Sequence, residues 1–198
     1  MTNSYKTINN SSEGIYKEKG SKFLSFAIPV TNIDEIKQIL EQYRKEYYDA
    51  RHVCYAYILG VEHDIYRAND DGEPSGTAGR PILGQINSFE LTNILVIVIR
   101  YFGGILLGTG GLITAYKEAA ADAIMQAQII EKTLKSEIII RFEYPLLNDV
   151  MRIIKELDAQ IITQQFETEC LIKISVSRQF AGVLRTRLEN IFGVNIEL

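Results

Sequence analysis

The stretch LTNILVIVIRYFGGILLGTGGLITAYKEAAADAIMQA, from Leu91 to Ala127, contains three patterns that decide the fold. Leu91 to Ile99 is a nearly continuous apolar run, which is typical of a strand buried on both faces. Gly103 to Gly111 follows as a glycine-rich loop. Small and apolar residues then recur at helical spacing, and the alanines among them would let a helix lie close against a sheet. These residues are Leu112, Ala115, Tyr116, Ala119, Ala120, Ala123 and Ala127.

The residues before this stretch predict further elements of the same sheet. Phe23 to Val30 is typical of a strand, and Asn32 with Glu35 three residues later predicts the start of a helix. The segment ARHVCYAYILG is rich in β-branched and aromatic residues and predicts a strand, with DIYRAND as its hairpin partner. One face of the first helix should pack on the sheet. That face consists of Ile33, Ile36, Leu40, Tyr43 and Tyr47.

From Ser136 the pattern changes to strand, helix, strand, strand, helix, strand, which predicts a ferredoxin-like split βαβ unit. The expected elements are strand Glu137 to Phe142, helix Leu146 to Leu157, strands Gln160 to Phe166 and Cys170 to Val176, a helix after Ser177, and strand Val194 to Glu197. We place the boundary at Glu131 to Ser136. The sequence therefore predicts an α+β protein with domains at residues 1–132 and 136–198.

Composition excludes several classes of protein. The formal charge of −4 argues against unspecific binding to polyanions, which usually needs a broad basic surface. The aliphatic run Ile94 to Ile99 is too short to span a membrane, and the polar N-terminal segment lacks the apolar stretch of a secretory signal. Cys54 and Cys170 lie far apart without metal-like spacing, so we expect two reduced thiols. We expect a cytoplasmic protein without membrane contact.

Two long motifs, DDGEPSGTAGRPIL (Asp70 to Leu83) and RYFGGILLGTGGLITAY (Arg100 to Tyr116), resemble the signature of the IMPACT/YigZ family, and RHVCYAY (Arg51 to Tyr57) resembles a third family segment. The resemblance implies an N-terminal domain with the fold of ribosomal proteins and elongation-factor domain IV, and a tail like the ferredoxin-like domains of elongation factor G. It implies a role in translation and its regulation. Eukaryotic members of the family regulate an amino-acid-starvation kinase by binding its activator. Thr114 stands where members of the family often carry a basic residue.

The second glycine loop also has an interpretation that needs no family. Gly108, Gly110 and Gly111 at the entrance of a helix would expose backbone N–H groups that can bind phosphate or carboxylate. The phosphate-binding G-x-x-x-x-G-K-S/T pattern is absent, since Thr109 follows Gly108 and the next lysine is Lys117. The alternative is a tight turn in which Gly110 or Gly111 needs a positive φ or close backbone approach. A small-molecule kinase is disfavoured because the chain lacks the larger C-terminal half and a clear catalytic base.

The first motif brings three carboxylates together. Asp70, Asp71 and Glu73 could hold Mg²⁺ or Ca²⁺, but Asp-Gly followed by Glu-Pro is also a turn signal, and we favour turn chemistry. We expect no metal and no cofactor. His52 and Cys54 should point to the same face of a strand, as a base and a nucleophile would, although a strand cysteine is more often a buried apolar group.

Together the residues and the family resemblance favour a binding protein over an enzyme, with RNA or the ribosome as a partner. The resemblance also implies translation-regulatory proteins as partners. Arg51 and Arg67 add charge near the motifs, and Tyr101 and Phe102 could stack on bases. We predict that both motifs converge on one surface site flanked by Arg80, Arg100 and Lys117. The candidate binding residues are Asp71, Gly72, Glu73, Pro74, Gly76, Thr77, Gly79, Arg80, Arg100, Tyr101, Gly103, Gly104, Gly108, Gly110, Gly111 and Lys117. The alternative is a small-molecule enzyme or anion-binding protein that uses the same loops, with His52 and Cys54 nearby.

Overall fold

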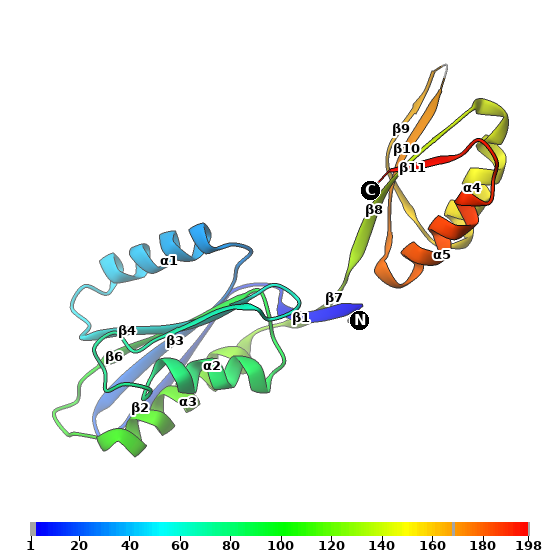
Figure 1. The fold of residues 1–198 in the computed structure, drawn as a ribbon. Coiled ribbons are helices and arrows are strands. Elements are labelled where there is room, and N and C mark those ends of the chain that lie inside the picture. The colour runs from blue at the N-terminus through cyan, green and yellow to red at the C-terminus, as the bar shows by residue number, and fades with distance from the viewer. Residues whose placement is uncertain (1–2, 168, 198) are drawn as a thin grey trace. The chain divides into compact units, whose positions relative to one another are not determined.

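The computed structural model describes residues 3–167 and 169–197 as a mixture of helices and strands (Figure 1). Residues 1–2, 168 and 198, which the two expected domains include, lie outside the described residues. The chain divides into two compact units. One runs from Tyr5 to Lys132, and the other begins at Thr133 and also includes Ser4. The α+β class expected from the sequence is confirmed.

The first unit is built on a five-stranded antiparallel sheet with the order β2-β3-β6-β4-β5. Its strands are β2 (Ser12–Glu18), β3 (Ser21–Pro29), β4 (His52–Leu59), β5 (Ile65–Asn69) and β6 (Ile94–Tyr101). Helix α1 (Ile33–Glu46) covers one face, while α2 (Gly79–Ser88) and α3 (Gly108–Gln126) cover the other (Figure 1). Hydrophobic cores lie on both sides of the sheet.

The central strand β6 is buried on both faces, as its apolar run predicts. Val96 and Val98 belong to the core beneath α2 and α3, whereas Leu95 and Ile97 belong to the core beneath α1. Because side chains alternate along a strand, Arg100 continues the α2/α3 side and Tyr101 the α1 side. This alternation decides which residues of the second motif can meet those of the first.

Two helices begin and pack largely as the sequence predicts. The Asn32 side chain accepts a hydrogen bond from the Glu35 N–H at 2.9 Å, which caps α1. Ile36 is buried on the inner face of α1, but Ile33 is 40% exposed and does not belong to that face. In α3 the alanines at 115, 119, 120 and 123 are fully buried, so the helix lies close against the sheet.

The expected boundary segment is not a loop. Strand β7 (Ile129–Thr133) pairs with β1 (Ser4–Ile8) in a two-stranded sheet and leads almost directly into β8. Asn9 N–H donates to the Gln128 carbonyl at one end of this pair, and Leu134 N–H donates to the Asn3 carbonyl at the other. Neither strand was expected from the sequence, because both are only five residues long and β7 is mostly exposed.

The second unit contains a four-stranded sheet with the order β11-β8-β10-β9 and two helices. Its elements are β8 (Lys135–Phe142), the short 3₁₀ helix η1 (Tyr144–Leu146), α4 (Leu147–Glu156), β9 (Gln160–Phe166), β10 (Cys170–Ser177), α5 (Arg178–Glu189) and β11 (Asn195–Glu197). The order of strands and helices agrees with the sequence pattern. Alternate residues of β8 and β10, such as Ile140 and Ile172, form a core with α4 and α5.

Within the described part of the chain, none of the helices is both long and apolar enough to cross a membrane.

Candidate functional site

The first motif lies between β5 and α2, and its leading acid is a helix cap. Asp70 accepts hydrogen bonds from the backbone N–H groups of Gly76, Ala78 and Gly79 at 2.8 to 3.0 Å. Burial alone would raise the pKa of Asp70, but these three donors and the nearby Arg80 hold it below its usual value. The N-terminus of α2 is therefore already neutralised by an internal carboxylate.

The second acid of the motif fastens the loop to its neighbours. One oxygen of Asp71 accepts the Val53 N–H on β4 at 2.7 Å, and the other pairs with Arg44 of α1, also at 2.7 Å. Asp71 and Gly72 both have left-handed φ values, of 43° and 86°, as a turn requires. The turn interpretation of this motif therefore explains Asp71.

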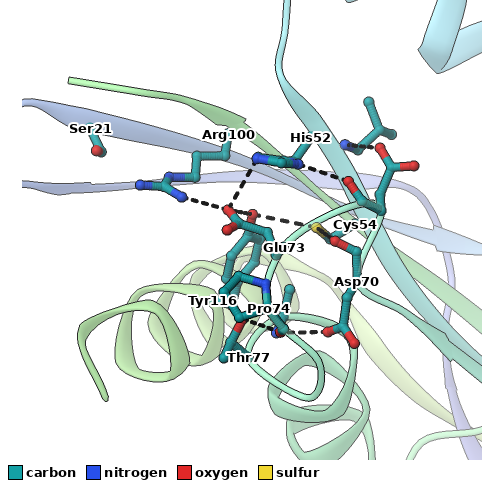
Figure 2. A network of polar contacts seen from close by, with 12 residues as sticks. Ser21, His52, Cys54, Asp70, Glu73, Pro74, Thr77, Arg100 and Tyr116 are labelled. Carbon is teal, nitrogen blue, oxygen red and sulfur yellow. Dashed lines mark hydrogen bonds and ion pairs between the residues drawn. The ribbon is translucent and has the colours of Figure 1, made fainter. Parts of the chain in front are cut away.

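The third acid, Glu73, is the centre of a buried polar network that joins both motifs (Figure 2). Its Oε1 accepts hydrogen bonds from Arg100 Nη1 at 2.6 Å and from the Tyr116 hydroxyl at 2.8 Å. The side chains of Glu73 and Arg100 are only 4% and 7% exposed. The Arg100 guanidinium also lies 5.6 Å from the ring centres of Phe23 and Phe102. Its buried Nε has no hydrogen-bond partner among the described residues.

The carboxylates of Asp70, Asp71 and Glu73 thus accept hydrogen bonds from different donors within the protein. Within residues 3–167 and 169–197, no group of three or more His, Cys, Asp or Glu side chains is arranged to hold a metal ion. The arrangement gives no support to the alternative in which Asp70, Asp71 and Glu73 share a divalent cation.

His52 and Cys54 point to the same side of β4 but have different surroundings (Figure 2). His52 Nδ1 lies 2.7 Å from the Asp71 carbonyl oxygen, which can only accept, so Nδ1 carries the proton of this bond. His52 Nε2 then faces Glu73 Oε1 at 3.8 Å. Cys54 is fully buried and donates to the Asp70 carbonyl at 3.0 Å. Burial raises the pKa of the Cys54 thiol, so it is protonated and unreactive at neutral pH.

The two glycine motifs meet in a pocket of about 450 Å³. Its lining contains two arginines and one glutamate, so it carries one net positive charge when His52 is neutral. The apolar wall includes Phe102, which is 43% exposed, and Leu106, which is 82% exposed. The lining residues are Arg51, His52, Gly72, Glu73, Pro74, Arg100, Phe102, Leu106, Leu107, Gly108, Thr109 and Leu112.

The glycines of the second motif have distinct roles. A Cβ at Gly103 would lie 1.9 Å from the Gly20 carbonyl carbon, so only glycine allows this close approach of two backbones. Gly108 has a φ of 71° at the entrance of α3. Gly110 has neither property: no atom lies within 4 Å of its Cβ position, and its φ is not positive. The expectation that Gly110 or Gly111 needs a positive φ or a close approach is therefore wrong for Gly110, which already lies in the first helical turn. At Gly111 a Cβ would lie 3.0 Å from the Leu107 Cβ, so a close approach is present there.

Several residues proposed from the sequence lie outside the pocket. Arg80 and Lys117 are exposed and do not line it. Tyr101 points to the other face of the sheet and donates to Asp49. The remaining loop residues shape the backbone: the Thr77 hydroxyl donates to the Pro74 carbonyl, Gly76 and Gly104 have positive φ, and Gly79 and Gly111 pack closely on Asn69 and Leu107.

Other residues at the site were not in the list of candidate binding residues, although Asp70 was considered as a metal ligand. Arg51, Phe102, Leu106, Leu107, Thr109 and Leu112 line the pocket, and Asp70 and Tyr116 complete the network. Arg51 and Phe102 were noted as charge and stacking residues, but nothing in the sequence ranked them above Arg80 or Tyr101. The period of two along β6 does carry a signal, because it separates Arg100 from Tyr101.

Comparison with known proteins agrees with these motifs. Residues 19–124 match the Impact N-terminal domain. The chain belongs to the IMPACT family. It is 34% identical over 160 residues to IMPACT family member YigZ of Escherichia coli, an alignment that covers 80% of this chain and 78% of YigZ. The family resemblance in the motifs is thereby confirmed.

Other members of the IMPACT family match smaller parts of the chain. IMPACT family member YvyE of Bacillus subtilis is 37% identical over 68% of this chain and 62% of its own length. Protein IMPACT of Rattus norvegicus is 33% identical over 46% of this chain and 30% of its own length. A crystal structure described as that of a hypothetical protein superposes with a TM-score of 0.72 at 28% identity, covering 99% of this chain and 97% of the other.

Proposed function

We propose that this member of the IMPACT family is a non-catalytic, cytoplasmic binding protein of translation and its regulation, and that it contacts RNA or the ribosome around the pocket where the two glycine motifs meet. The observation that carries the proposal is the convergence of both motifs on one pocket with a positive lining and an exposed aromatic ring. Cationic side chains beside an aromatic face are the usual means of holding unpaired nucleotides.

Family membership supports the link to translation, since the family resemblance implies this role for both domains. The second unit adds to it. Its sheet order β11-β8-β10-β9, with α4 and α5 on one face, is that of a ferredoxin-like unit, the type of domain that the resemblance associates with elongation factor G. We treat residues 1–132 and 136–198 as the two domains of this proposal. Translation-regulatory proteins are a second class of partner.

The enzymatic alternative finds less support in the geometry. A thiol nucleophile would have to be accessible and ionised. Cys54 is instead buried and donates a hydrogen bond to the Asp70 carbonyl, and burial raises the pKa of its thiol. Glu73 is held by Arg100 and Tyr116, so its carboxylate is engaged in the network. His52 has an oriented ring, and it lines the pocket, so it can hydrogen-bond a ligand there.

Sedimentation of ribosomes from native lysate, with and without ribonuclease, tests the proposal. The wild-type protein should sediment with ribosomes and lose this association after ribonuclease. The double variant Arg51→Ala/Phe102→Ala should remain in the supernatant. The matched control Arg80→Ala/Lys117→Ala removes one more cation than the test pair but leaves the pocket lining unchanged, and it should behave as wild type.

Association that survives ribonuclease would instead favour a protein partner. Loss of association in the Arg80→Ala/Lys117→Ala control, with the pocket variant unaffected, would place the contact surface away from the pocket.

A further inference from the structure

The two helix N-termini near the glycine motifs differ in whether a side chain accepts hydrogen bonds from their backbone N–H groups. At α2, the carboxylate of Asp70 accepts three backbone N–H groups. At α3, the N-cap residue Leu107 makes no side-chain hydrogen bond, and the first turn contains no acidic residue. The first turn of a helix carries a partial positive charge and unpaired N–H donors. In α3 these donors lie beside the pocket, because Gly108 and Thr109 both line it.

A second, independent feature of the pocket also points to an anion. Arg100 lines the pocket, is 6% exposed, and has a buried Nε without a hydrogen-bond partner among the described residues. Arg51 lines the same pocket and makes no ion pair or hydrogen bond within the described part of the chain. The single acid of the lining, Glu73, is already paired with Arg100. The unpaired guanidinium of Arg51 and a helix N-terminus together match the acceptor oxygens of a phosphate.

The apolar part of the lining suits a planar, apolar group. One side of Phe102 lies against the Arg100 guanidinium, while the ring remains 43% exposed. Leu106 and Leu107 extend this wall. A volume of about 450 Å³ lies within the range of pockets that hold small molecules. The pocket thus places an anion site and a stacking surface within one cavity.

We propose that this pocket binds a phosphate monoester attached to a nucleoside, with the phosphate at the first turn of α3 and Arg51 and the base against Phe102. The ligand is either a free nucleoside 5′-monophosphate or the 5′-phosphorylated end of an RNA. This inference rests on the proposed function only because both use the same pocket. It adds the chemical group that the pocket recognises, a terminal phosphate.

The test follows the NMR amide resonances of Gly108, Gly110 and Gly111 in the full chain. Four probes are titrated: adenosine 5′-monophosphate, adenosine, and one short oligoribonucleotide with either a 5′-phosphate or a 5′-hydroxyl. Adenosine 5′-monophosphate and the 5′-phosphorylated oligonucleotide should shift these resonances at lower concentration than their unphosphorylated counterparts. Tighter binding of the phosphorylated oligonucleotide than of the mononucleotide identifies an RNA end as the source, and the reverse identifies a free nucleotide.

Two variants separate binding from folding. Thr109→Asp places a carboxylate in the first turn of α3, where it stabilises the helix and repels phosphate, so the melting temperature should stay level or rise while phosphate-dependent binding is lost. The matched neutral control Thr109→Asn should bind within a few-fold of wild type. Arg51→Ala should weaken binding of the monophosphate by about 10-fold, a typical effect of one charge-assisted contact.

Equal binding of the 5′-phosphorylated and 5′-hydroxyl oligonucleotides would overturn this inference and leave the proposed function intact. Wild-type affinity for the monophosphate in Thr109→Asp would overturn it as well. Failure of ribosome sedimentation with retained binding of the mononucleotide would overturn the proposed function alone.

Discussion

Glu73 Oε1 and Arg100 Nη1 lie 2.6 Å apart, with both side chains more than nine-tenths buried, and this ion pair joins the first glycine motif to the second. Two charges in a protein interior are stable only when they are paired and hydrogen-bonded. Tyr116 supplies the additional hydrogen bond to Glu73. The pair therefore fixes the relative position of the two loops that line the pocket.

Loss of one partner of this pair should be strongly destabilising. Glu73→Gln keeps the side-chain shape but leaves the Arg100 charge buried without compensation, and it should lower the free energy of unfolding by about 3 kcal/mol. Urea denaturation measures the change. Glu41→Gln, which breaks the exposed Lys45–Glu41 pair, is the matched control and should change stability by less than about 1 kcal/mol. Equal effects of the two substitutions would show that the Glu73 pair is not a buried unit.

Asp70 should give the protein a distinct dependence on pH. Its folded-state pKa is below the usual value, so its stabilisation is complete above an ordinary aspartate pKa of about 4 and is lost as the pH falls through the lower folded-state pKa. Asp70→Asn cannot accept all three backbone donors and should destabilise by about 1 to 2 kcal/mol at pH 7. The difference between variant and wild type, followed by urea denaturation, should shrink between pH 5 and pH 2. A difference that stays constant over this range would contradict the role of the ionised carboxylate.

The glycines of the second motif should differ sharply in their tolerance of a side chain. Gly103→Ala brings Cβ against the Gly20–Ser21 backbone and should cost about 2 kcal/mol or more. Gly110→Ala meets open space in a helical turn and should stabilise by about 0.5 to 1 kcal/mol. Thermal melts of the two variants make the comparison. A loss of stability at 110 similar to that at 103 would contradict the positions of these residues.

The sequence could predict those features that depend on residues close together in the chain. The buried strand β6, the alanine face of α3 and the Asn32 cap depend on spacing within one element, and the structure contains them. The burial of Arg100 depends on Glu73, 27 residues away, and no local pattern distinguishes it from Arg80. The pairing of β1 with β7 likewise depends on a contact between distant segments.

The division of the chain near Thr133 leads to a prediction about folding. A fragment of residues 1–132 retains the five-stranded sheet and the helices on both of its faces, so it should unfold in a single cooperative transition. Urea denaturation followed by circular dichroism tests this. A fragment without a cooperative transition would show that the first unit depends on the second.

The central claim, that the pocket is the RNA-contacting surface, is tested most directly by the salt dependence of binding to a short single-stranded RNA. Each phosphate contact contributes to the slope of log affinity against log salt concentration. Arg51→Ala should reduce the magnitude of this slope by about 1 unit at unchanged stability. Arg80→Ala/Lys117→Ala, the pair favoured by sequence alone, should retain the wild-type slope. A wild-type slope in Arg51→Ala together with a reduced slope in Arg80→Ala/Lys117→Ala would contradict the account.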